Sequence, residues 1–341
     1  MIQKLKTDLN RNLSNLFGWR TNRKIIVIES DDWGSIRMDS KNAFDALLKA
    51  GIPVDACHYN SNDALESNED LEMLMELLSK FKDKNNKAPV MTGVNIVANP
   101  DFDKIAKNNF SKYEFELFTD TCARYPKHDR VYSLWKEACE KRLIVPVFHG
   151  REHLNVQRWM RALSEGCQST KSAFDHRVTG ILEGINGQAL KNYQAAFDLD
   201  YPSDLEYQKE VIKTGLDIFE DLYGYRSEFF IPTNGPFNNG LESICYEEGV
   251  RYLGTAKFQK EPLGNGKFKN HFRYIGKKSP IGMTYLTRNA FFEPCSWEHS
   301  LSKDWVSDCL NEIKIAFRWG KPATISSHRV NYIGLVKSRK P

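Results

Sequence analysis

Short apolar runs rich in β-branched and aromatic residues alternate with amphipathic helical patterns along most of the chain. Several of these runs are apolar almost throughout, as strands covered on both faces are. The predicted strands are Lys24–Ile28, Pro89–Val97, Tyr113–Phe118, Leu143–Phe148, Glu228–Ile231, Arg251–Leu253, Met283–Leu286 and Ala323–Ser326. Repeated strand–helix units predict a parallel sheet, and their number favours closure into an α/β barrel. An open doubly wound sheet is the alternative, although no glycine-rich turn marks a dinucleotide site.

The length of 341 residues suits one α/β barrel or two ordinary domains. No internal repeat or clear boundary divides the sequence, so we expect a single domain over residues 1–341. Residues 166–202 fit the strand–helix rhythm poorly and are predicted to form an insertion or lid. The segment Gly264-Asn265-Gly266-Lys267 is typical of a hairpin turn rather than a phosphate-binding loop.

The charge pattern excludes several classes of partner. The net charge of +4 comes from 48 basic and 44 acidic residues scattered along the chain, so no basic arm for nucleic acid is expected. No apolar run is long enough to cross a bilayer, and the N-terminus lacks the apolar stretch of a signal peptide. Seven cysteines without a CxxC motif predict free thiols, so we expect a cytoplasmic protein. The sequence leaves the oligomeric state open.

Polar clusters directly follow three of the predicted strands. The first runs from Glu29 to Gly34 and contains Asp31 and Asp32. The second holds His149 and His153, and the third holds His328. Barrel enzymes carry their active sites at the carboxyl ends of the strands, so this shared location predicts one common site.

The residue types in these clusters are typical of a metal-dependent hydrolase. On a turn or helix start, His149 and His153 would face the same way and could share a cation. Of the adjacent Asp31 and Asp32, one carboxylate can bind the cation while the other acts as a base. His328 can protonate a leaving group. The structural alternatives are turn or helix-cap aspartates and histidines on a solvated surface.

Two imidazoles and one carboxylate leave coordination positions open for water and substrate. A divalent metal held in this way would acidify water and polarise an acyl oxygen. Zinc is the metal we expect, although cobalt, nickel or iron would also fit these ligands. No cysteine or cofactor motif joins the set, which favours hydrolysis over redox chemistry.

With these motifs in this order, the sequence resembles the NodB-homology polysaccharide deacetylases of carbohydrate esterase family four. Ser30-Asp31-Asp32-Trp33-Gly34 is similar to their first motif, His149 and His153 to their second, and Ile325-Ser326-Ser327-His328 to their last. The resemblance implies a distorted (β/α)₇ barrel. It also implies Asp31 as general base, His328 as general acid, and Asp32, His149 and His153 as metal ligands.

The sequence departs from the family pattern at the third motif, which is typically Arg-x-Pro-Tyr. The best match is Phe230-Ile231-Pro232-Thr233-Asn234-Gly235, which has neither the arginine nor the tyrosine. Asn234 or an adjacent backbone amide is expected to hold the oxyanion. The missing positive charge is expected from Arg151, Arg288 or Arg329. Trp33, which replaces the glycine that usually follows the aspartate pair, is expected to contact the sugar together with Asn234 and Arg288.

The sequence therefore predicts a hydrolase that removes an acetyl group from an N- or O-acetylated saccharide. A second hypothesis uses the same site on another carbon–nitrogen bond, such as a formyl group or a small cyclic amide. A third is a carbohydrate-binding barrel that has lost turnover, which the altered third motif keeps open.

Overall fold

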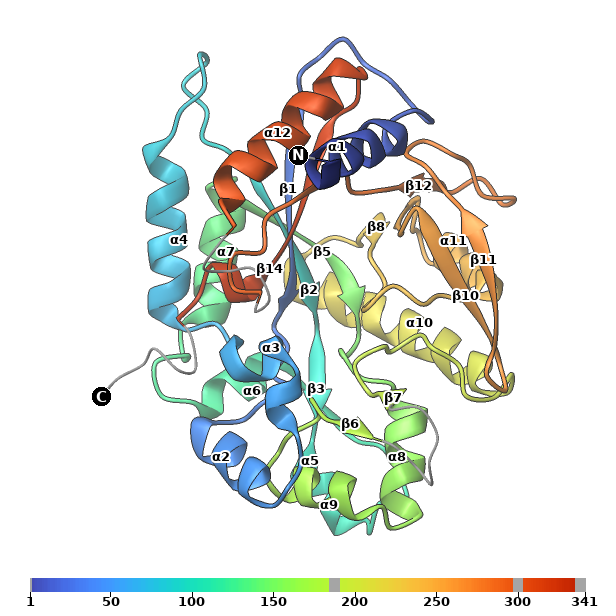
Figure 1. The fold of residues 1–341 in the computed structure, drawn as a ribbon. Coiled ribbons are helices and arrows are strands. Elements are labelled where there is room, and N and C mark those ends of the chain that lie inside the picture. The colour runs from blue at the N-terminus through green and yellow to red at the C-terminus, as the bar shows by residue number, and fades with distance from the viewer. Residues whose placement is uncertain (1, 184–190, 297–302, 335–341) are drawn as a thin grey trace.

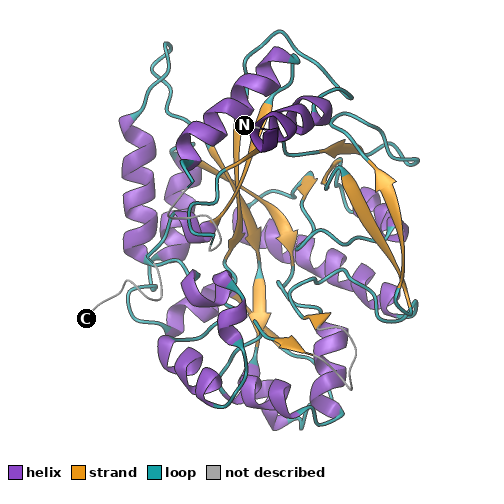
Figure 2. Ribbon diagram, in the orientation of Figure 1, coloured by secondary structure: helices purple, strands orange, loops and turns teal. Residues whose placement is uncertain are grey.

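The computed structural model of the protein describes residues 2–183, 191–296 and 303–334. Its centre is an eight-stranded sheet in which all neighbouring strands are parallel, in the order β12-β9-β8-β5-β2-β1-β14-β13 (Figures 1 and 2). Its strands are β1 (Ile26–Trp33), β2 (Met91–Ile96), β5 (Ile144–Gly150), β8 (Phe229–Phe230), β9 (Tyr252–Gly254), β12 (Thr284–Leu286), β13 (Ala290–Phe291) and β14 (Ala323–His328). The predicted parallel sheet is confirmed.

The two edge strands of this sheet, β12 and β13, follow each other directly in the chain. Residues 287–289 alone separate Leu286 from Ala290, and a linker of this length spans at most about 15 Å. The sheet must therefore curl until its edges nearly meet. This makes it a distorted α/β barrel, as predicted, with Arg288 in the seam between the edges.

Helices cover the outside of the barrel (Figure 2). Helix α10 packs against β5, α4 packs against α7, and α12 packs against β13, β14 and α1. The helices are α1 (Ile2–Ser14), α2 (Lys41–Lys49), α3 (His58–Asn62), α4 (Asn68–Lys80), α5 (Phe102–Lys107), α6 (Phe118–Arg124), α7 (Val131–Glu140), α8 (Val156–Ser164), α9 (Gln168–Asp175), α10 (Asp204–Tyr223), α11 (Glu242–Glu247) and α12 (Trp305–Arg318). Among the described residues, no helix is both long and apolar enough to span a membrane.

Within the described residues, three short antiparallel pairs lie outside the barrel sheet. They are β3 (Ala98–Pro100) with β4 (Phe115–Leu117), β6 (Leu182–Glu183) with β7 (Lys191–Asn192), and β10 (Phe258–Gly264) with β11 (Lys267–Phe272). The hairpin predicted at Gly264 is therefore confirmed as the β10–β11 turn. The predicted strand Tyr113–Phe118 is wrong as a barrel strand, because β4 pairs only with β3 at the barrel rim.

A second hydrophobic core lies beyond the carboxyl ends of the strands, in the lower half of Figure 1. It is built largely from side chains of α2, α5, α8 and α9. Phe174 of α9 packs on Phe102 and Trp159, with ring centroids 5.1 and 5.7 Å away. The described part of residues 166–202 thus packs into the folded body beside the strand ends, and a lid function for it stays a prediction.

Candidate metal centre

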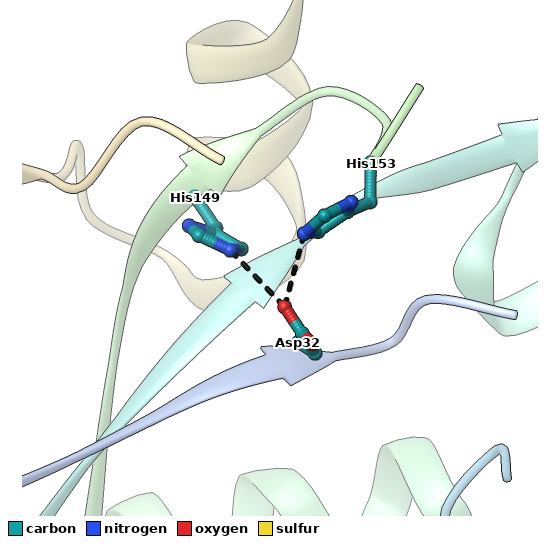
Figure 3. Close-up of side chains that lie close together, drawn as sticks. All are labelled: Asp32, His149 and His153. Carbon is teal, nitrogen blue, oxygen red and sulfur yellow. Dashed lines mark hydrogen bonds and ion pairs between the residues drawn. The ribbon is translucent and has the colours of Figure 1, made fainter. Parts of the chain in front are cut away.

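Three buried side chains from distant parts of the chain meet at one point (Figure 3). Ligand atoms of Asp32, His149 and His153 all lie within 4.8 Å of one another. The Nε2 atoms of His149 and His153 are 3.4 and 3.0 Å from Oδ1 of Asp32. The distant segments predicted to converge do so at the carboxyl ends of β1 and β5.

Two β-bulges aim these side chains at each other. In β1, the register with β2 shifts between Ser30 and Trp33, and Asp32 has a left-handed backbone with φ of 77°. In β5, Phe148 and Gly150 pair with consecutive residues of β2, so His149 is the extra residue. A bulge bends its strand and redirects one side chain. Regular pleating would point the adjacent Asp31 and Asp32 to opposite faces of the sheet, whereas with the bulge both side chains line the same cavity.

His153 lies in the loop after β5 and precedes α8, whose first turn is capped by Asn155. The two histidines are therefore not one turn apart on a helix, which was one interpretation of their spacing. The strand end carries His149, and the loop turns back to bring His153 beside it, with ring centroids 5.3 Å apart.

The hydrogen bonds around the cluster fit a bound cation. Nδ1 of His149 donates to the carbonyl oxygen of Ile231 at 2.6 Å, so in the neutral ring Nε2 carries a lone pair. That lone pair faces a carboxylate oxygen of Asp32 3.4 Å away. Burial lowers the pKa of His153 despite the nearby Asp32 carboxylate, which favours its neutral form as well. Electron pairs that face one another in a buried site are stabilised by a cation between them.

The second oxygen of Asp32 is already engaged. Oδ2 accepts a hydrogen bond from Arg37 at 2.6 Å. Burial would raise the pKa of Asp32, but the neighbouring His153 and Arg37 side chains hold it well below the ordinary value. Asp32 is thus ionised, with Oδ2 bound by Arg37 and Oδ1 facing the two imidazoles.

Asp31 forms a separate buried ion pair at the barrel seam. Arg288 donates from Nη1 and Nη2 to the two oxygens of Asp31, each at 2.6 Å, and from Nε to Glu29 at 2.6 Å. Burial opposes ionisation, but Arg288 lowers the pKa of Asp31 below its ordinary value. Of the three arginines considered for the charge missing from the third motif, Arg288 is the one beside this aspartate.

His328 lies on the other side of Asp31, with Nε2 3.9 Å from a carboxylate oxygen of that residue. Its Nδ1 is 2.5 Å from Oε1 of Glu293 and 3.1 Å from the hydroxyl oxygen of Tyr59. Burial opposes protonation, but Glu293 outweighs it and raises the pKa of His328 to about 9. His328 is therefore protonated at neutral pH.

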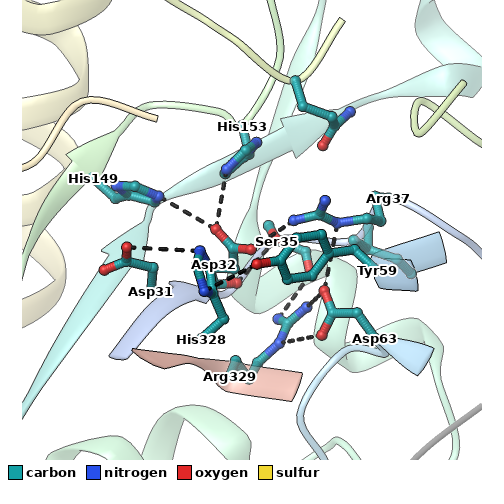
Figure 4. A network of polar contacts seen from close by, with 12 residues as sticks. Asp31, Asp32, Ser35, Arg37, Tyr59, Asp63, His149, His153, His328 and Arg329 are labelled. Carbon is teal, nitrogen blue, oxygen red and sulfur yellow. Dashed lines mark hydrogen bonds and ion pairs between the residues drawn. The ribbon is translucent and has the colours of Figure 1, made fainter. Parts of the chain in front are cut away.

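A buried ion-pair network supports the cluster from below (Figure 4). Arg329 donates to Asp63 at 2.8 Å and to Glu66 at 2.7 Å, and Nε of Arg37 is 3.5 Å from Asp63. Asp63 therefore links Arg37, which donates to Asp32, to Arg329, which follows His328 in the chain. This network fixes the ends of β1 and β14 relative to each other.

The cluster opens into a cavity of about 620 Å³. Its lining includes Asp31, His328, Arg288 and Asn234 together with the three candidate ligands. Trp33 does not line the cavity. It is fully buried in the core, where its ring packs edge-on against Trp135 at 5.4 Å and its Nε1 donates to Ser30.

Several residues of the site carried little or no sequence signal. Glu29 lies in the same polar cluster as Asp31, and Glu293 lies in the segment that follows Arg288, so both could have been suspected. Arg37 and Tyr59 are isolated in the sequence and reach the site only through the fold.

The fold and the cluster together define a distorted α/β barrel with a buried Asp–His–His candidate metal centre. No model of a known protein family matches the chain, and no curated protein matches it. Similar solved structures include the carbohydrate deacetylase Agd3 (9% identity, TM-score 0.42) and IcaB from Ammonifex degensii (13% identity, TM-score 0.30). The alpha-amylase AmyC from Thermotoga maritima is also similar (10% identity, TM-score 0.35).

The alignments cover 91%, 73% and 82% of this chain, respectively. They cover 46% of Agd3, 90% of IcaB and 47% of AmyC, so the chain spans about half the length of Agd3 and AmyC. At such low identities and TM-scores, the likeness is confined to the general course of the chain.

Proposed function

We propose that the protein is a metal-dependent hydrolase that removes an acetyl group from an N- or O-acetylated saccharide. The observation that carries the proposal is the buried cluster of Asp32, His149 and His153, in which two imidazole nitrogens face one carboxylate oxygen. These residues would hold a divalent cation, with zinc the best match to two nitrogens and one oxygen.

When bound, the cation would supply a Lewis acid that polarises the acyl oxygen and acidifies water. Asp31 is the proposed general base, because Arg288 keeps it ionised and oriented toward the cavity. His328 is the proposed general acid, because Glu293 keeps it protonated on the opposite side of Asp31. Asp31 without a proton and His328 with one can then act as base and acid at the same pH, because their different surroundings favour opposite protonation states.

Two further residues have supporting roles in this proposal. Asn234 or a neighbouring amide in the cavity wall would stabilise the oxyanion. Arg288 lines the cavity and stays a proposed contact of the sugar, and its hydrogen bonds to Asp31 and Glu29 support a second role in orienting the base. Trp33 is too deeply buried to serve as the sugar-stacking residue that we had expected.

The choice of an acetylated saccharide rests on the order of the motifs and their resemblance to the NodB-homology deacetylases. The same groups could open another carbon–nitrogen bond, such as a formyl amide, because the chemistry at the acyl carbon is the same. A cavity of about 620 Å³ accommodates small molecules of either kind.

The first experiment is elemental analysis of the purified protein, followed by assays of acetate and formate release from a panel of acylated sugars and amides. We expect one equivalent of metal, lost together with activity in Asp32→Ala and His149→Ala. His176→Ala, a histidine outside the cluster, is the matched control and should retain both. Metal-loaded protein that binds glycans but releases no acyl group would instead identify a binding barrel.

The cytoplasm is the proposed compartment. All seven cysteines are free thiols, which is typical of proteins that work in a reducing environment. Cell fractionation with thiol labelling checks this, and recovery of the protein outside the cell with oxidised cysteines would contradict it.

A further inference from the structure

Four phenylalanines form an exposed patch beside the mouth of the cavity. Phe258, Phe268 and Phe272 share one face of the β10–β11 hairpin, because Phe258 pairs with Phe272 and Phe268 lies four pairs further along, on the same side of the ladder. Phe17, just after α1, packs edge-on against Phe272 at 5.6 Å. Their exposed fractions are 75% for Phe258, 53% for Phe268, 43% for Phe272 and 52% for Phe17. Water-soluble surfaces rarely leave so many aromatic side chains together, so this phenylalanine patch requires a partner.

Helix α1, which ends at Ser14 just before Phe17, has an unusual polarity. Two of its polar residues face the protein, where Arg11 pairs with Asp308 of α12 and Asn12 accepts a hydrogen bond from Trp319. Its apolar residues Leu9 and Leu13, one turn apart, face solvent. A helix that packs on a globular core normally does the reverse. The outward apolar face therefore fits an apolar environment outside the protein.

The exposed charges of the β10–β11 hairpin have one sign. The hairpin carries three exposed lysines: Lys260 lies on the face of the phenylalanines, and Lys267 and Lys269 lie on the opposite face, because they alternate with Phe268. Its single acidic residue, Glu261, is buried and paired with His271. Aromatic side chains fringed by lysines are typical of surfaces that rest at the headgroup level of an anionic bilayer. Two copies of this surface would bring like charges together, which disfavours self-association.

The phenylalanine patch and the candidate active site share residues at the mouth of the cavity. Phe258 belongs to both, and Arg11 and Ser14 of α1 also line the cavity. A bilayer in contact with the patch would therefore lie against the entrance.

We propose that the phenylalanine patch docks the protein on an anionic lipid surface, with the cavity mouth facing the bilayer. The consequence rests on the proposed function: the substrate is then an acylated saccharide carried on a lipid, presented at the membrane surface. Docking itself requires no metal and no catalysis.

The test is co-sedimentation of the full chain with vesicles of phosphatidylcholine, with and without phosphatidylglycerol. We expect binding to the anionic vesicles that weakens with salt. Phe268→Ser and Phe272→Ser should each weaken it by about tenfold, since each removes a buried aromatic contact with the bilayer. Leu77→Ser is the matched control and should bind normally, because Leu77 is similarly exposed and belongs to α4, a helix on the opposite side of the barrel from the hairpin in Figure 1.

A second variant keeps the test informative if the phenylalanine substitutions unfold the hairpin. The exposed triple change Lys260→Glu, Lys267→Glu and Lys269→Glu should abolish the preference for phosphatidylglycerol. Asp32→Ala should bind vesicles like the unmodified chain, which separates this proposal from the catalytic one. Failure to bind anionic vesicles, equal losses in Leu77→Ser and Phe268→Ser, or a dimer that Phe268→Ser dissociates would each overturn lipid docking.

Discussion

Asp31 and Asp32 are adjacent in the chain but occupy different chemical environments. Asp32 faces two imidazoles and Arg37, whereas Asp31 faces Arg288 and His328. Both carboxyl groups are held below their ordinary pKa, by different partners. The difference assigns them separate roles in the proposed reaction, and each role can be removed alone.

Replacing the proposed base should separate metal binding from turnover. We expect Asp31→Asn to retain its metal and lose activity by about 10²–10⁴-fold, the usual contribution of a positioned base. Metal content and acyl release measured on the same preparation check this. Full activity of Asp31→Asn on the correct substrate would show that the base is another group.

The alkaline limit of activity should depend on Glu293. His328 must be protonated to act as an acid, and its raised pKa of about 9 places the loss of activity above that pH. In Glu293→Gln the raising interaction is removed, so the limit should move down by about 1–2 pH units. A pH profile of kcat/KM for both proteins measures the shift, and unchanged profiles would remove Glu293 from the mechanism.

The interaction between Glu293 and His328 also changes how the stability of the fold depends on pH. Because folding raises the pKa of His328, its stabilising effect is complete below the unfolded histidine pKa and is lost as the pH rises through about 9.

At the level of elements, the site depends on strand ends and on the helix that supports β5. Gly215 of α10 lies against Phe148, next to His149, and a Cβ there would be 2.7 Å from the phenylalanine ring. Helix α10 therefore approaches β5 closely at Gly215, next to the bulge at His149.

Gly215→Ala should destabilise the protein although alanine favours helices. The helix gains about 1 kcal/mol, but forcing a methyl group into the contact costs ~1–3 kcal/mol. We expect lower thermal stability and weaker metal binding, because α10 must shift away from β5. Lys213→Ala on the exposed face of the same helix is the control. Equal or greater stability of Gly215→Ala would mean that the ring of Phe148 can move aside at little cost in free energy.

Seven of the eight strands of the barrel sheet could be predicted from the sequence, but β13 was missed and the ends of β1 and β14 were placed too early. β1 and β14 continue past the predicted Ile28 and Ser326 to Trp33 and His328. Most of the added residues are polar, and in a sequence such residues suggest a loop. Charged residues can be buried at a strand end only when partners from elsewhere in the fold pair with them, and the sequence does not reveal those partners. The partner of Asp31 was undecidable among Arg151, Arg288 and Arg329 for the same reason. Arg151 pairs with Glu152 and Arg329 with Asp63, which leaves Arg288 at the seam.

Over the whole molecule, the candidate centre ties β1 to β5 and the loop before α8. A cation that binds only the folded state should therefore stabilise the entire fold, by about 2.7 kcal/mol at a hundredfold excess over its Kd.

Thermal unfolding with and without zinc measures this effect. After chelation, we expect a lower Tm that added zinc restores, and Asp32→Ala should show no response. A Tm indifferent to zinc in the chelated, unmodified protein would contradict the assignment of the centre.

The contact between Arg37 and Asp32 limits what the centre can hold. With Oδ2 engaged by the guanidinium, the aspartate can grip an ion through one oxygen and cannot chelate it with both. Large hard ions such as calcium rely on many oxygen donors and often on chelating carboxylates. In the proposed centre, this hydrogen bond would therefore favour compact ions that accept few ligands and bind nitrogen well.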